Sequence, residues 1–375
     1  MRVLQLGKFF PPVRGGIETA TQALADGLCA RGVEVDVLVA HTGWCTQRAR
    51  ATGGYGIVRA GSAGQLLSTS MAPRLPLELA AQAGRYDVVH VHMPDPLAAV
   101  AVWWARPRGH VVLHWHSDVV RQRLAMALYG PLQRWLLARA DAVIATSEPY
   151  AEASEALRPW RHKVHVIPLG IADPRPRLES ARVAAFRSAH AGRRLVAALG
   201  RMTHYKGFDV LVDAAAALPA DTRVLIAGAG EGLQALRARV DTLGLQDRVR
   251  LLGPLDDGDV PALLEAAELF CLPSTGRAEA FGLAMLEAMA MGRAVVCSSI
   301  PGSGVPWVSR DGETGLCVPP RDAAALAGAL RRLLQDPALA ARMGQAGRAR
   351  FETTFQAAAM VDATLALYRS LAASR

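Results

Sequence analysis

The chain has 375 residues and a formal net charge of +9 at pH 7, with 51% hydrophobic and 20% charged residues. This length exceeds one ordinary hydrophobic core and favours two domains, and the globular composition argues against a disordered tail. The cysteines are odd in number and form no C-x-x-C pair, so we expect buried thiols rather than disulfides or metal ligands. They are Cys29, Cys45, Cys271, Cys297 and Cys317.

Two segments bear on membrane association. Residues 1–7 predict a strand at the very start, without a charged leader and cleavage site ahead of it. The longest apolar helical stretch, 97–105, falls far short of the ~20 residues that a membrane span requires. We therefore expect a cytoplasmic protein that is soluble or peripheral on the inner face of the plasma membrane.

A pattern of strand, loop, helix and strand occurs twice. Its predicted segments are 3–6, 17–31 and 35–40, and again 195–199, 208–218 and 224–227. Two such starts predict an α/β protein with two Rossmann-like halves. The proline-bearing stretch 173–177 cannot continue a helix and predicts the hinge, and two helical segments after Asp336-Pro337 end the chain.

Gly15 and Gly16 lie between a proline-stiffened loop and the first predicted helix. Glycine allows a ligand to approach the backbone closely, and free N–H groups at a helix N-terminus bind anions. The pair is typical of a phosphate-binding loop or of a plain helix cap, and the residues alone leave both open.

His114 and His116 alternate with Trp115 in one predicted strand, so the two imidazoles share a face. A histidine on a strand face is often a core residue, and the residues alone do not decide which of the two joins a site. A zinc site built from this pair with His90 and His92 has little support. Both pairs are spaced for adjacent strands, and no cysteine or acid completes a ligand set.

Basic and aromatic side chains cluster between residues 103 and 139. On amphipathic helices this combination is typical of an anionic membrane surface or a lipid diphosphate as partner, and an Arg-rich solvated face is the alternative. A nucleic-acid partner is not expected, because the sequence carries no nucleic-acid-binding motif. The residues are Trp103, Trp104, Arg106, Arg108, Trp115, Arg121, Arg123, Tyr129, Arg134, Trp135 and Arg139.

A second glycine-bounded loop, 200–207, follows an apolar strand and carries Arg201 and Lys206. Two fixed cations at a strand end suit a diphosphate, because charge-assisted contacts to phosphate are strong. A solvated loop charge is the alternative. We expect Lys206→Ala to weaken diphosphate binding and to leave the fold intact.

The segment from Glu279 to Glu287 reads E-A-F-G-L-A-M-L-E and follows a further apolar strand. Gly282 would let a ligand approach the backbone, and the N–H groups of Leu283 and Ala284 would point at an anion. Glu287 lies about one turn further into the helix. One of the two acids can face a sugar hydroxyl while the other reaches a ribose. The alternative is that Glu279 is an ordinary loop acid and Glu287 an ordinary helix-surface acid.

Together these motifs resemble the retaining GT-B glycosyltransferases of family GT4, over nearly the whole chain. The motifs are Gly15-Gly16-Ile17-Glu18, Gly200-Arg201 with Lys206-Gly207, and Glu279 to Glu287, supported by segments 87–92, 140–147, 166–171 and 311–316.

The resemblance implies a GT-B fold in which two Rossmann-like domains face a central cleft. Residues 1–172 would form the acceptor-binding domain, 173–192 the linker and 193–354 the nucleotide-sugar-binding domain. The last helix, within 355–375, would cross back to the N-terminal domain.

The implied activity is hexosyl transfer with retention of configuration, without a separate protein nucleophile. Positive charge would stabilise the departing diphosphate. The residues implied as catalytic are His116, Arg201, Lys206 and Glu279. Those implied as donor-binding are Gly15, Gly16, Arg201, Lys206, Glu279, Phe281, Gly282, Leu283 and Glu287.

We expect neither a cofactor nor a metal. Asp257-Gly258-Asp259 matches the D-x-D pattern with which other glycosyltransferases hold a divalent ion. It lies just ahead of a helix start at Pro261, where an acid is a natural N-cap, so we predict a capping role.

Three other enzyme classes share part of this pattern. A glycosidase with paired carboxylates has no use for Lys206 on a phosphate-type loop. An NAD-dependent enzyme would show G-x-G-x-x-G after the first strand, where this chain has Gly7-Lys8-Phe9-Phe10. A non-hydrolysing sugar-nucleotide epimerase shares the GT-B architecture and remains the alternative.

The stretch 302–307 resembles hexosyltransferases that build bacterial surface polysaccharide on polyprenyl diphosphate carriers. The resemblance implies GDP-mannose or a related GDP-deoxyhexose as donor, with UDP-hexoses left open. The implied acceptor is a lipid-linked or polysaccharide glycan, in lipopolysaccharide or exopolysaccharide synthesis.

Overall fold

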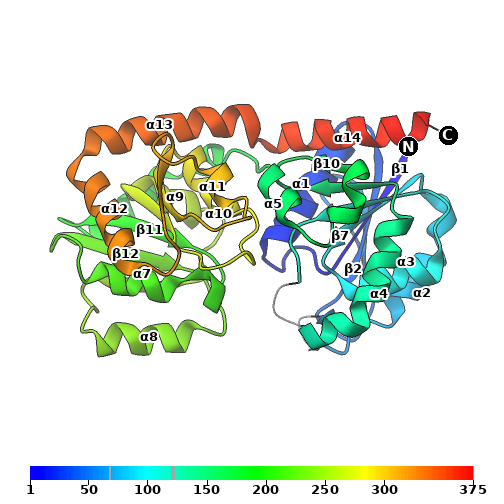
Figure 1. Ribbon diagram of the computed structural model, residues 1–375, viewed down its shortest axis with the longest axis horizontal. Helices are drawn as coiled ribbons and strands as arrows, with labels where there is room; N and C mark the ends of the chain where they lie inside the picture. Colours follow the sequence, from blue (N-terminus) through cyan, green and yellow to red (C-terminus); the bar gives the residue numbers. More distant parts are fainter. Residues whose placement is uncertain (67–68, 120–122, 375) are drawn as a thin grey trace. The chain divides into compact units, whose positions relative to one another are not determined.

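The computed structural model describes residues 1–66, 69–119 and 123–374 (Figure 1). The chain divides into two compact units. Unit 1 comprises Met1–Ile171 with Ala357–Arg375, and unit 2 comprises Ala172–Gln356. Each unit is built on its own sheet of predominantly parallel strands with helices between them, so the predicted α/β fold with two Rossmann-like domains is confirmed.

The sheet of unit 1 has the strand order β10-β9-β8-β7-β1-β2-β4-β3. Its neighbours pair in parallel, apart from the antiparallel edge pair of β3 and β4. The bounds are β1 Arg2–Gly7, β2 Glu34–Ala40, β3 Gln47–Arg50, β4 Gly56–Ala60, β7 Val88–Met93, β8 His110–Trp115, β9 Ala142–Ala145 and β10 Val164–Val166; β5 (Gln65–Leu66) and β6 (Thr69–Ser70) form a separate pair.

The central strands of unit 1 are buried on both faces. This is typical of a parallel sheet covered by helices and explains their nearly continuous apolar runs. Histidines interrupt those runs in β7 and β8, yet every residue of the two strands is buried. The helices are α1 Gly16–Ala30, α2 Arg74–Ala80, α3 Pro96–Ala105, α4 Arg123–Arg139, α5 Glu148–Ala153 and α14 Ala357–Ala373.

The C-terminal helix α14, red in Figure 1, packs against α1 within unit 1. The approach is close at Gly27, where an added Cβ would lie 2.5 Å from a methyl group of Val361. Arg31 at the end of α1 also pairs with Asp362. The sequence predicted a final helix within 355–375, and the observed helix begins at Ala357 because Phe355 ends the preceding helix.

The sheet of unit 2 has the order β13-β12-β11-β14-β15-β16, and all of these neighbours pair in parallel. The strands are β11 Arg194–Leu199, β12 Thr222–Ala227, β13 Val249–Gly253, β14 Leu269–Leu272, β15 Ala294–Ser298 and β16 Gly315–Val318. The helices are α6 Ser180–Ala189, α7 Phe208–Ala215, α8 Leu233–Thr242, α9 Asp259–Ala266, α10 Leu283–Ala290, α11 Val305–Val308, α12 Ala323–Gln335 and α13 Pro337–Thr354.

The stretch 173–192, predicted as a linker, is structured and belongs to unit 2. Its helix α6 packs on α9, buries Val183 and pairs Arg182 with Asp259 at 2.7 Å. At the start of the stretch, Asp173 pairs with Arg348 of α13 at 2.6 Å. The prolines do prevent a helix at 173–177 beyond the 3₁₀ turn Arg175–Arg177, but the helix α6 that follows packs against α9.

Candidate active site

Each sheet has a point where the strand order reverses. In unit 1 the chain runs outward from β1 to β2 and later from β7 to β8, so the reversal falls between β1 and β7. In unit 2 it falls between β11 and β14. Open α/β sheets bind ligands outside the carboxyl ends of the strands at such points. The predicted site loops after β1, β11 and β14 all begin there.

In unit 2 the two loops bring Lys206 and Glu279 together as a buried ion pair. Lys206 ends the 3₁₀ turn η4 (His204–Lys206), and its Nζ lies 2.6 Å from Oε2 of Glu279. Burial by itself favours the neutral amine, but the carboxylate outweighs it and raises the pKa of Lys206 above its usual value. Lys206 is therefore a fixed ammonium rather than a solvated loop charge.

Two serines hold Glu279 in place. Ser274 donates from Oγ to Oε2 of Glu279 at 2.9 Å, and Ser303 donates from Oγ to its carbonyl oxygen at 2.5 Å. Both serines are fully or almost fully buried. Oε1 of Glu279 has no partner among the residues that the structure describes, so one carboxylate oxygen remains able to accept a hydrogen bond.

Glycines are required at two positions beside this pair. Gly207 has a φ of +66°, and a Cβ there would lie 2.1 Å from the carbonyl oxygen of Pro273. Gly282 has a φ of +82°, and a Cβ there would lie 2.7 Å from Met285 and 2.8 Å from Leu272. Both conformations are strained for other residues, so the glycines set the paths of the two loops.

Helix α10 starts directly after Gly282 and has no side-chain N-cap. The first N–H groups of a helix lack partners within it, so those of Leu283 and Ala284 suit an anion. Phe281, predicted to assist through its backbone, also packs its ring edge-on against Phe355 at 5.9 Å. That ring anchors the loop in the core of unit 2.

Glu287 lies one turn into α10 and is partly buried. Burial raises the pKa of Glu287 to about 7; Asp257 adds to the rise, while the positive charge of Arg177 opposes it. In the described part of the chain it has no hydrogen bond or ion pair. Its carboxyl group is thus available to a ligand and changes charge near neutral pH.

Arg201, the other predicted cation, follows Gly200 and is exposed. Its charge lowers the pKa of Lys206 slightly against the larger opposing effect of Glu279. The two cations therefore act on the same region of unit 2.

In unit 1, α1 begins at Gly16 with Gly15 as its N-cap, and no side chain caps the helix. A Cβ at Gly15 would lie 2.2 Å from a carboxylate oxygen of Glu18 in the first turn. A carboxylate so close to a helix N-terminus occupies the region that suits an anion. The roles predicted for Gly15 and Gly16 remain predictions.

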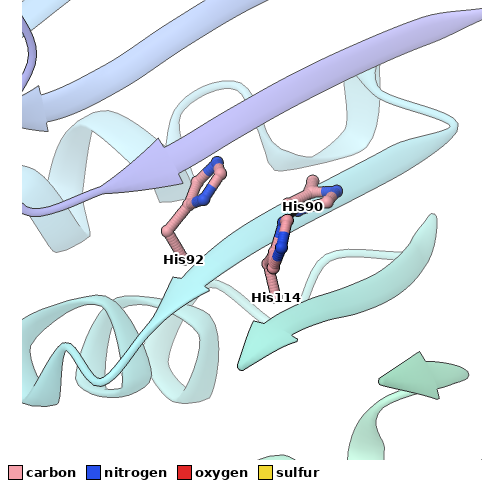
Figure 2. Close-up of side chains that lie close together, drawn as sticks. All are labelled: His90, His92 and His114. Atoms are coloured by element: carbon pink, nitrogen blue, oxygen red, sulfur yellow. Dashed lines mark hydrogen bonds between the residues drawn. The ribbon is translucent and has the colours of Figure 1, made fainter. Parts of the chain in front are cut away.

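His116 comes directly after β8 and belongs to a cluster of four buried imidazoles. Its ring stacks on that of His114, with centroids 4.2 Å apart and planes 13° apart, so the predicted shared face is confirmed. His116 Nε2 lies 2.9 Å from Nδ1 of His92, and His114 Nδ1 lies 3.3 Å from Nε2 of His90. Figure 2 shows His90 and His92 of β7 with His114 of β8.

All four imidazoles are neutral near pH 7. Burial lowers the pKa of His114 to about 3. Burial, reinforced by repulsion between the rings, lowers the pKa of His90, His92 and His116 far below the usual value. Every ring therefore has one donor nitrogen and one acceptor nitrogen.

The structure brings His90, His92 and His114 close enough that one ring nitrogen of each lies within 4.8 Å of the others. The planes of His92 and His114 are only 23° apart. Nearly parallel rings do not converge their in-plane lone pairs on one ion, which opposes the tetrahedral geometry of zinc. The absence of a metal stays a prediction.

The capping role predicted for Asp257 and Asp259 belongs to their neighbour. Asp256 accepts from the backbone N–H groups of Gly258 and Asp259 at 2.9 and 2.8 Å. Asp259 instead pairs with Arg182 of α6. The capping residue is Asp256, one position before the predicted Asp257, because an aspartate side chain can reach N–H groups two and three residues ahead.

The basic and aromatic segment does not form one exposed face. Trp115 is fully buried and donates from its indole N–H to Asp118 at 2.9 Å, and Tyr129 is also buried. Trp103 and Trp104 on α3 are 45% and 60% exposed. Arg106, Arg108 and Arg134 are exposed as well, and the side chains of Arg121 and Arg123 lie outside the described residues.

The buried-thiol expectation holds only in part. All five cysteines are free, but Cys45 is exposed, while Cys271 and Cys297 are buried and Cys29 and Cys317 partly so. Four residues that support the site were not predicted: Ser274, Ser303, Gln5 and Tyr368. Ser274 lies shortly before the motif that begins at Glu279, and Ser303 lies within the stretch 302–307, so both could have been suspected from the sequence. No local pattern marks Gln5 or Tyr368.

Comparison with known proteins agrees with this geometry. Residues 184–350 match the family described as "Glycosyl transferases group 1", and residues 14–175 match "Glycosyltransferase Family 4". The chain is 32% identical to O-antigen chain mannosyltransferase C of Escherichia coli, over 100% of both chains. It is 34% identical to D-rhamnosyltransferase WbpZ of Pseudomonas aeruginosa, over 95% of this chain and 93% of that one.

Among solved structures, sucrose-phosphate synthase from Thermosynechococcus elongatus superposes with a TM-score of 0.83 at 26% identity, covering all of both chains. The two-domain α/β fold agrees with these matches to sugar-transferring enzymes. The chain belongs to the GT4 family of GT-B glycosyltransferases. The resemblance noted in the sequence is confirmed.

Among the described residues, no helix combines the length and apolar character needed to cross a membrane.

Proposed function

We propose that this glycosyltransferase is a retaining, metal-independent hexosyltransferase of bacterial surface-glycan synthesis. Its donor is GDP-mannose or a related GDP-deoxyhexose, with UDP-hexoses as the alternative, and its acceptor is a lipid-linked or polysaccharide glycan. The mannosyltransferase and the D-rhamnosyltransferase among its relatives support a hexose or deoxyhexose donor, and the O-antigen relative supports a surface glycan.

The buried pair of Lys206 and Glu279 carries the proposal. The Lys206 ammonium, already held by Glu279, can donate a further hydrogen bond to a diphosphate, and the free Oε1 of Glu279 can accept from a sugar hydroxyl. A buried ion pair contributes little net stability when compared with apolar residues of similar volume. Its placement at the sheet reversal is therefore better explained by ligand binding than by folding.

In the proposed reaction, the bond between the anomeric carbon and the diphosphate oxygen breaks as the sugar becomes oxocarbenium-like. The negative charge that develops on the leaving diphosphate is stabilised by Lys206 and Arg201 and by the N-terminus of α10. The acceptor hydroxyl attacks from the face that the diphosphate leaves, so configuration is retained and no protein nucleophile is needed.

Glu287 binds the ribose hydroxyls of the nucleotide in this proposal. Ionised Glu287 can accept two hydrogen bonds, and the pKa of about 7 means that a bound nucleotide would shift it toward the charged form. His116 orients the donor sugar from unit 1. Gly15 and Gly16 supply backbone contact to the diphosphate.

The first test is a thermal-shift comparison of GDP, UDP, ADP and NAD, each with and without EDTA. A ligand at 100 times its dissociation constant adds roughly 2.7 kcal/mol of stability, which is readily measured. We expect stabilisation by GDP that EDTA leaves unchanged. A shift with UDP alone would transfer the donor assignment to UDP-hexoses, and a shift with NAD alone would refute the phosphate-loop assignment.

The epimerase alternative is separated by dependence on the acceptor. An epimerase converts the nucleotide sugar alone, whereas the proposed enzyme yields a stable glycoside only when acceptor is present. We expect incubation of donor without acceptor to return no epimeric nucleotide sugar. Formation of that epimer at a steady rate would overturn the transferase proposal in favour of the epimerase.

We further propose that α3 docks on an anionic membrane surface where a lipid-linked acceptor resides. Trp103 and Trp104 are exposed on α3, and Arg106 and Arg108 follow them. Exposed indoles with adjacent cations suit the interface of an anionic bilayer. Trp103→Ser with Trp104→Ser should reduce co-sedimentation with phosphatidylglycerol vesicles, while Trp44→Ser, which removes an exposed indole outside α3, should not.

A further inference from the structure

Six buried side chains of unit 1 form one continuous hydrogen-bonded chain that links β7 and β8 to β1 and α14. No member is more than 6% exposed. The order along the chain is His116, His92, Gln5, Tyr368, His90 and His114. Because the imidazoles are neutral, each must donate at one nitrogen and accept at the other, so the whole chain has a direction.

The direction toward His116 is set by Gln5. Its amide oxygen lies 2.9 Å from Nε2 of His92 and can only accept, so His92 carries its proton on Nε2. Nδ1 of His92 is then an acceptor, and it lies 2.9 Å from Nε2 of His116. His116 must therefore donate from Nε2, which leaves its Nδ1 unprotonated.

The direction toward His114 is set by the other end of the same amide. Gln5 donates from Nε2 to the Tyr368 hydroxyl at 3.4 Å, which leaves the single proton of that hydroxyl available to Nδ1 of His90. His90 then donates from Nε2 to Nδ1 of His114. His114 is left with a proton on its buried Nε2, which has no partner in the described part of the chain.

Gln5 thus fixes the proton on Nε2 at His92 and His116, and with the Tyr368 proton directed at His90 the other arm gives the same tautomer at His90 and His114. Turning the Gln5 amide over would reverse every donor and acceptor and place each proton on Nδ1. The chain therefore has two states, and the orientation of one amide selects between them. Nδ1 of His116, the nitrogen that does not bond His92, is an acceptor when the protons are on Nε2 and a donor when they are on Nδ1.

We propose that Gln5 and His92 are positioning residues that hold His116 in its Nε2–H tautomer, so that Nδ1 accepts a hydrogen bond from a hydroxyl of the donor sugar. This rests on the proposed function, in which His116 contacts that sugar. Nδ1 has no partner among the described residues, and His116 follows the carboxyl end of β8, where ligands of parallel sheets bind. Sugars offer hydroxyl donors, so a fixed acceptor selects one orientation of the donor sugar.

The tautomers can be observed directly in the wild-type protein without substrate. Nuclear magnetic resonance of ring ¹⁵N-labelled histidine distinguishes protonated from unprotonated ring nitrogens, and single His→Asn substitutions assign the signals. We expect Nε2–H at His90, His92, His114 and His116. A proton on Nδ1 of His116, or a mixture of both forms there, overturns the proposal.

Gln5→Met tests the coupling, because it keeps the volume of the side chain and removes its amide. We expect His92 and His116 to become mixtures of tautomers and the transfer rate kcat to fall roughly tenfold, which corresponds to about 1.4 kcal/mol. Thr364→Val is the matched control, since Thr364 is also fully buried in unit 1 and loses only a hydrogen bond to Met360. It should change neither the tautomers nor kcat.

The outcomes separate this proposal from the proposed function. Unchanged tautomers in Gln5→Met overturn the coupling, and altered tautomers with unchanged kcat overturn its role in transfer. If Gln5→Met does not fold, the wild-type spectrum still decides the tautomer of His116. A wild-type protein that transfers no sugar from any nucleotide donor refutes the proposed function, and the Nε2–H assignment would still stand.

Discussion

The two units build polar sites by opposite means. In unit 2, Lys206 and Glu279 are full charges 2.6 Å apart in a buried setting. In unit 1, the imidazoles around His116 are all uncharged and are ordered by hydrogen bonds alone. Charge suits a diphosphate, which is itself charged, whereas a neutral acceptor of fixed direction suits a hydroxyl.

The comparison also indicates how each site fails. Removing one member of a buried ion pair leaves an uncompensated charge in the core. Removing one member of a neutral hydrogen-bonded chain leaves an unpaired polar group, which costs less stability than an unpaired charge. Its neighbours then no longer have fixed donor and acceptor nitrogens. Substitutions at the unit 2 site should therefore change mainly stability and nucleotide affinity. Substitutions in the unit 1 chain should change mainly the histidine tautomers and the rate of transfer.

The largest effect is expected for Lys206→Ala, which strands the Glu279 carboxylate. We expect a loss of about 3–5 kcal/mol in the free energy of unfolding, measured by urea denaturation. Affinity for the nucleoside diphosphate should fall roughly 10–100-fold, because a charge-assisted hydrogen bond is lost. The sequence alone predicted an intact fold for this substitution, and the ion pair corrects that expectation.

The double variant Lys206→Ala with Glu279→Gln separates the two effects. Its neutral amide can still accept from Ser274, so much of the lost stability should return. Nucleotide affinity should stay low because no ammonium is present. If affinity recovered with stability, Lys206 would be a folding residue and the contrast between the two units would disappear.

The sequence predicted the parts of the site that depend on local order. Glycines at loop ends, the acid at 279 and the start of α10 all follow from short motifs, and alternation placed His114 and His116 on one face. The two-domain fold followed from the repeated strand and helix pattern. The linker was mispredicted because prolines mark a break in helix but not whether the next helix docks.

The rest of the site depends on residues far apart in sequence. His90 meets Tyr368 across 278 residues, and no local pattern indicates which helix face will cover β7. The pairing of Lys206 with Glu279 likewise requires that β11 and β14 be neighbours, which is a property of the sheet order. Likewise, the burial that raises the pKa of Glu287 is visible only once α10 is packed.

Gly282→Ala is expected to lower both stability and nucleotide affinity. A Cβ here would lie less than 3 Å from the side-chain ends of Met285 and Leu272, which must move aside, and the φ of +82° itself is strained for alanine. We expect a loss of about 1–3 kcal/mol in unfolding free energy and weaker nucleotide binding. Gly276→Ala in the same loop is the control, because its Cβ would meet nothing within 4 Å. Equal effects of both would mean that the loop path is unimportant.

Glu287→Gln should alter the pH dependence of stability. The folded pKa is about 7 against an ordinary value of 4.5, so the folded state binds more protons between these pH values. Stability from this group is therefore present below pH 4.5 and lost as pH rises to 7, by about 3 kcal/mol. The variant should lack that loss, which urea denaturation at pH 5 and pH 8 can measure.

The same group links nucleotide binding to pH. If the ionised form accepts from the ribose, affinity for the nucleoside diphosphate should rise between pH 6 and pH 8 in the wild type. Glu287→Gln should flatten this dependence. An equal rise in the variant would remove Glu287 from the nucleotide site while leaving its effect on stability intact.

The smallest effect is expected for Asp259→Asn, together with removal of metal by EDTA. The carboxylate of Asp259 pairs with Arg182 at 2.7 Å, so the charge of Asp259 already has a partner within unit 2. The capping of the turn depends on Asp256 and not on Asp259. An asparagine can still accept from that guanidinium, and we expect kcat to stay within about twofold. A D-x-D that held a catalytic ion would instead lose most activity in the variant and in EDTA alike. Such a result would place a third, metal-centred kind of charge in unit 2 and would require the diphosphate to be bound by an ion rather than by Lys206.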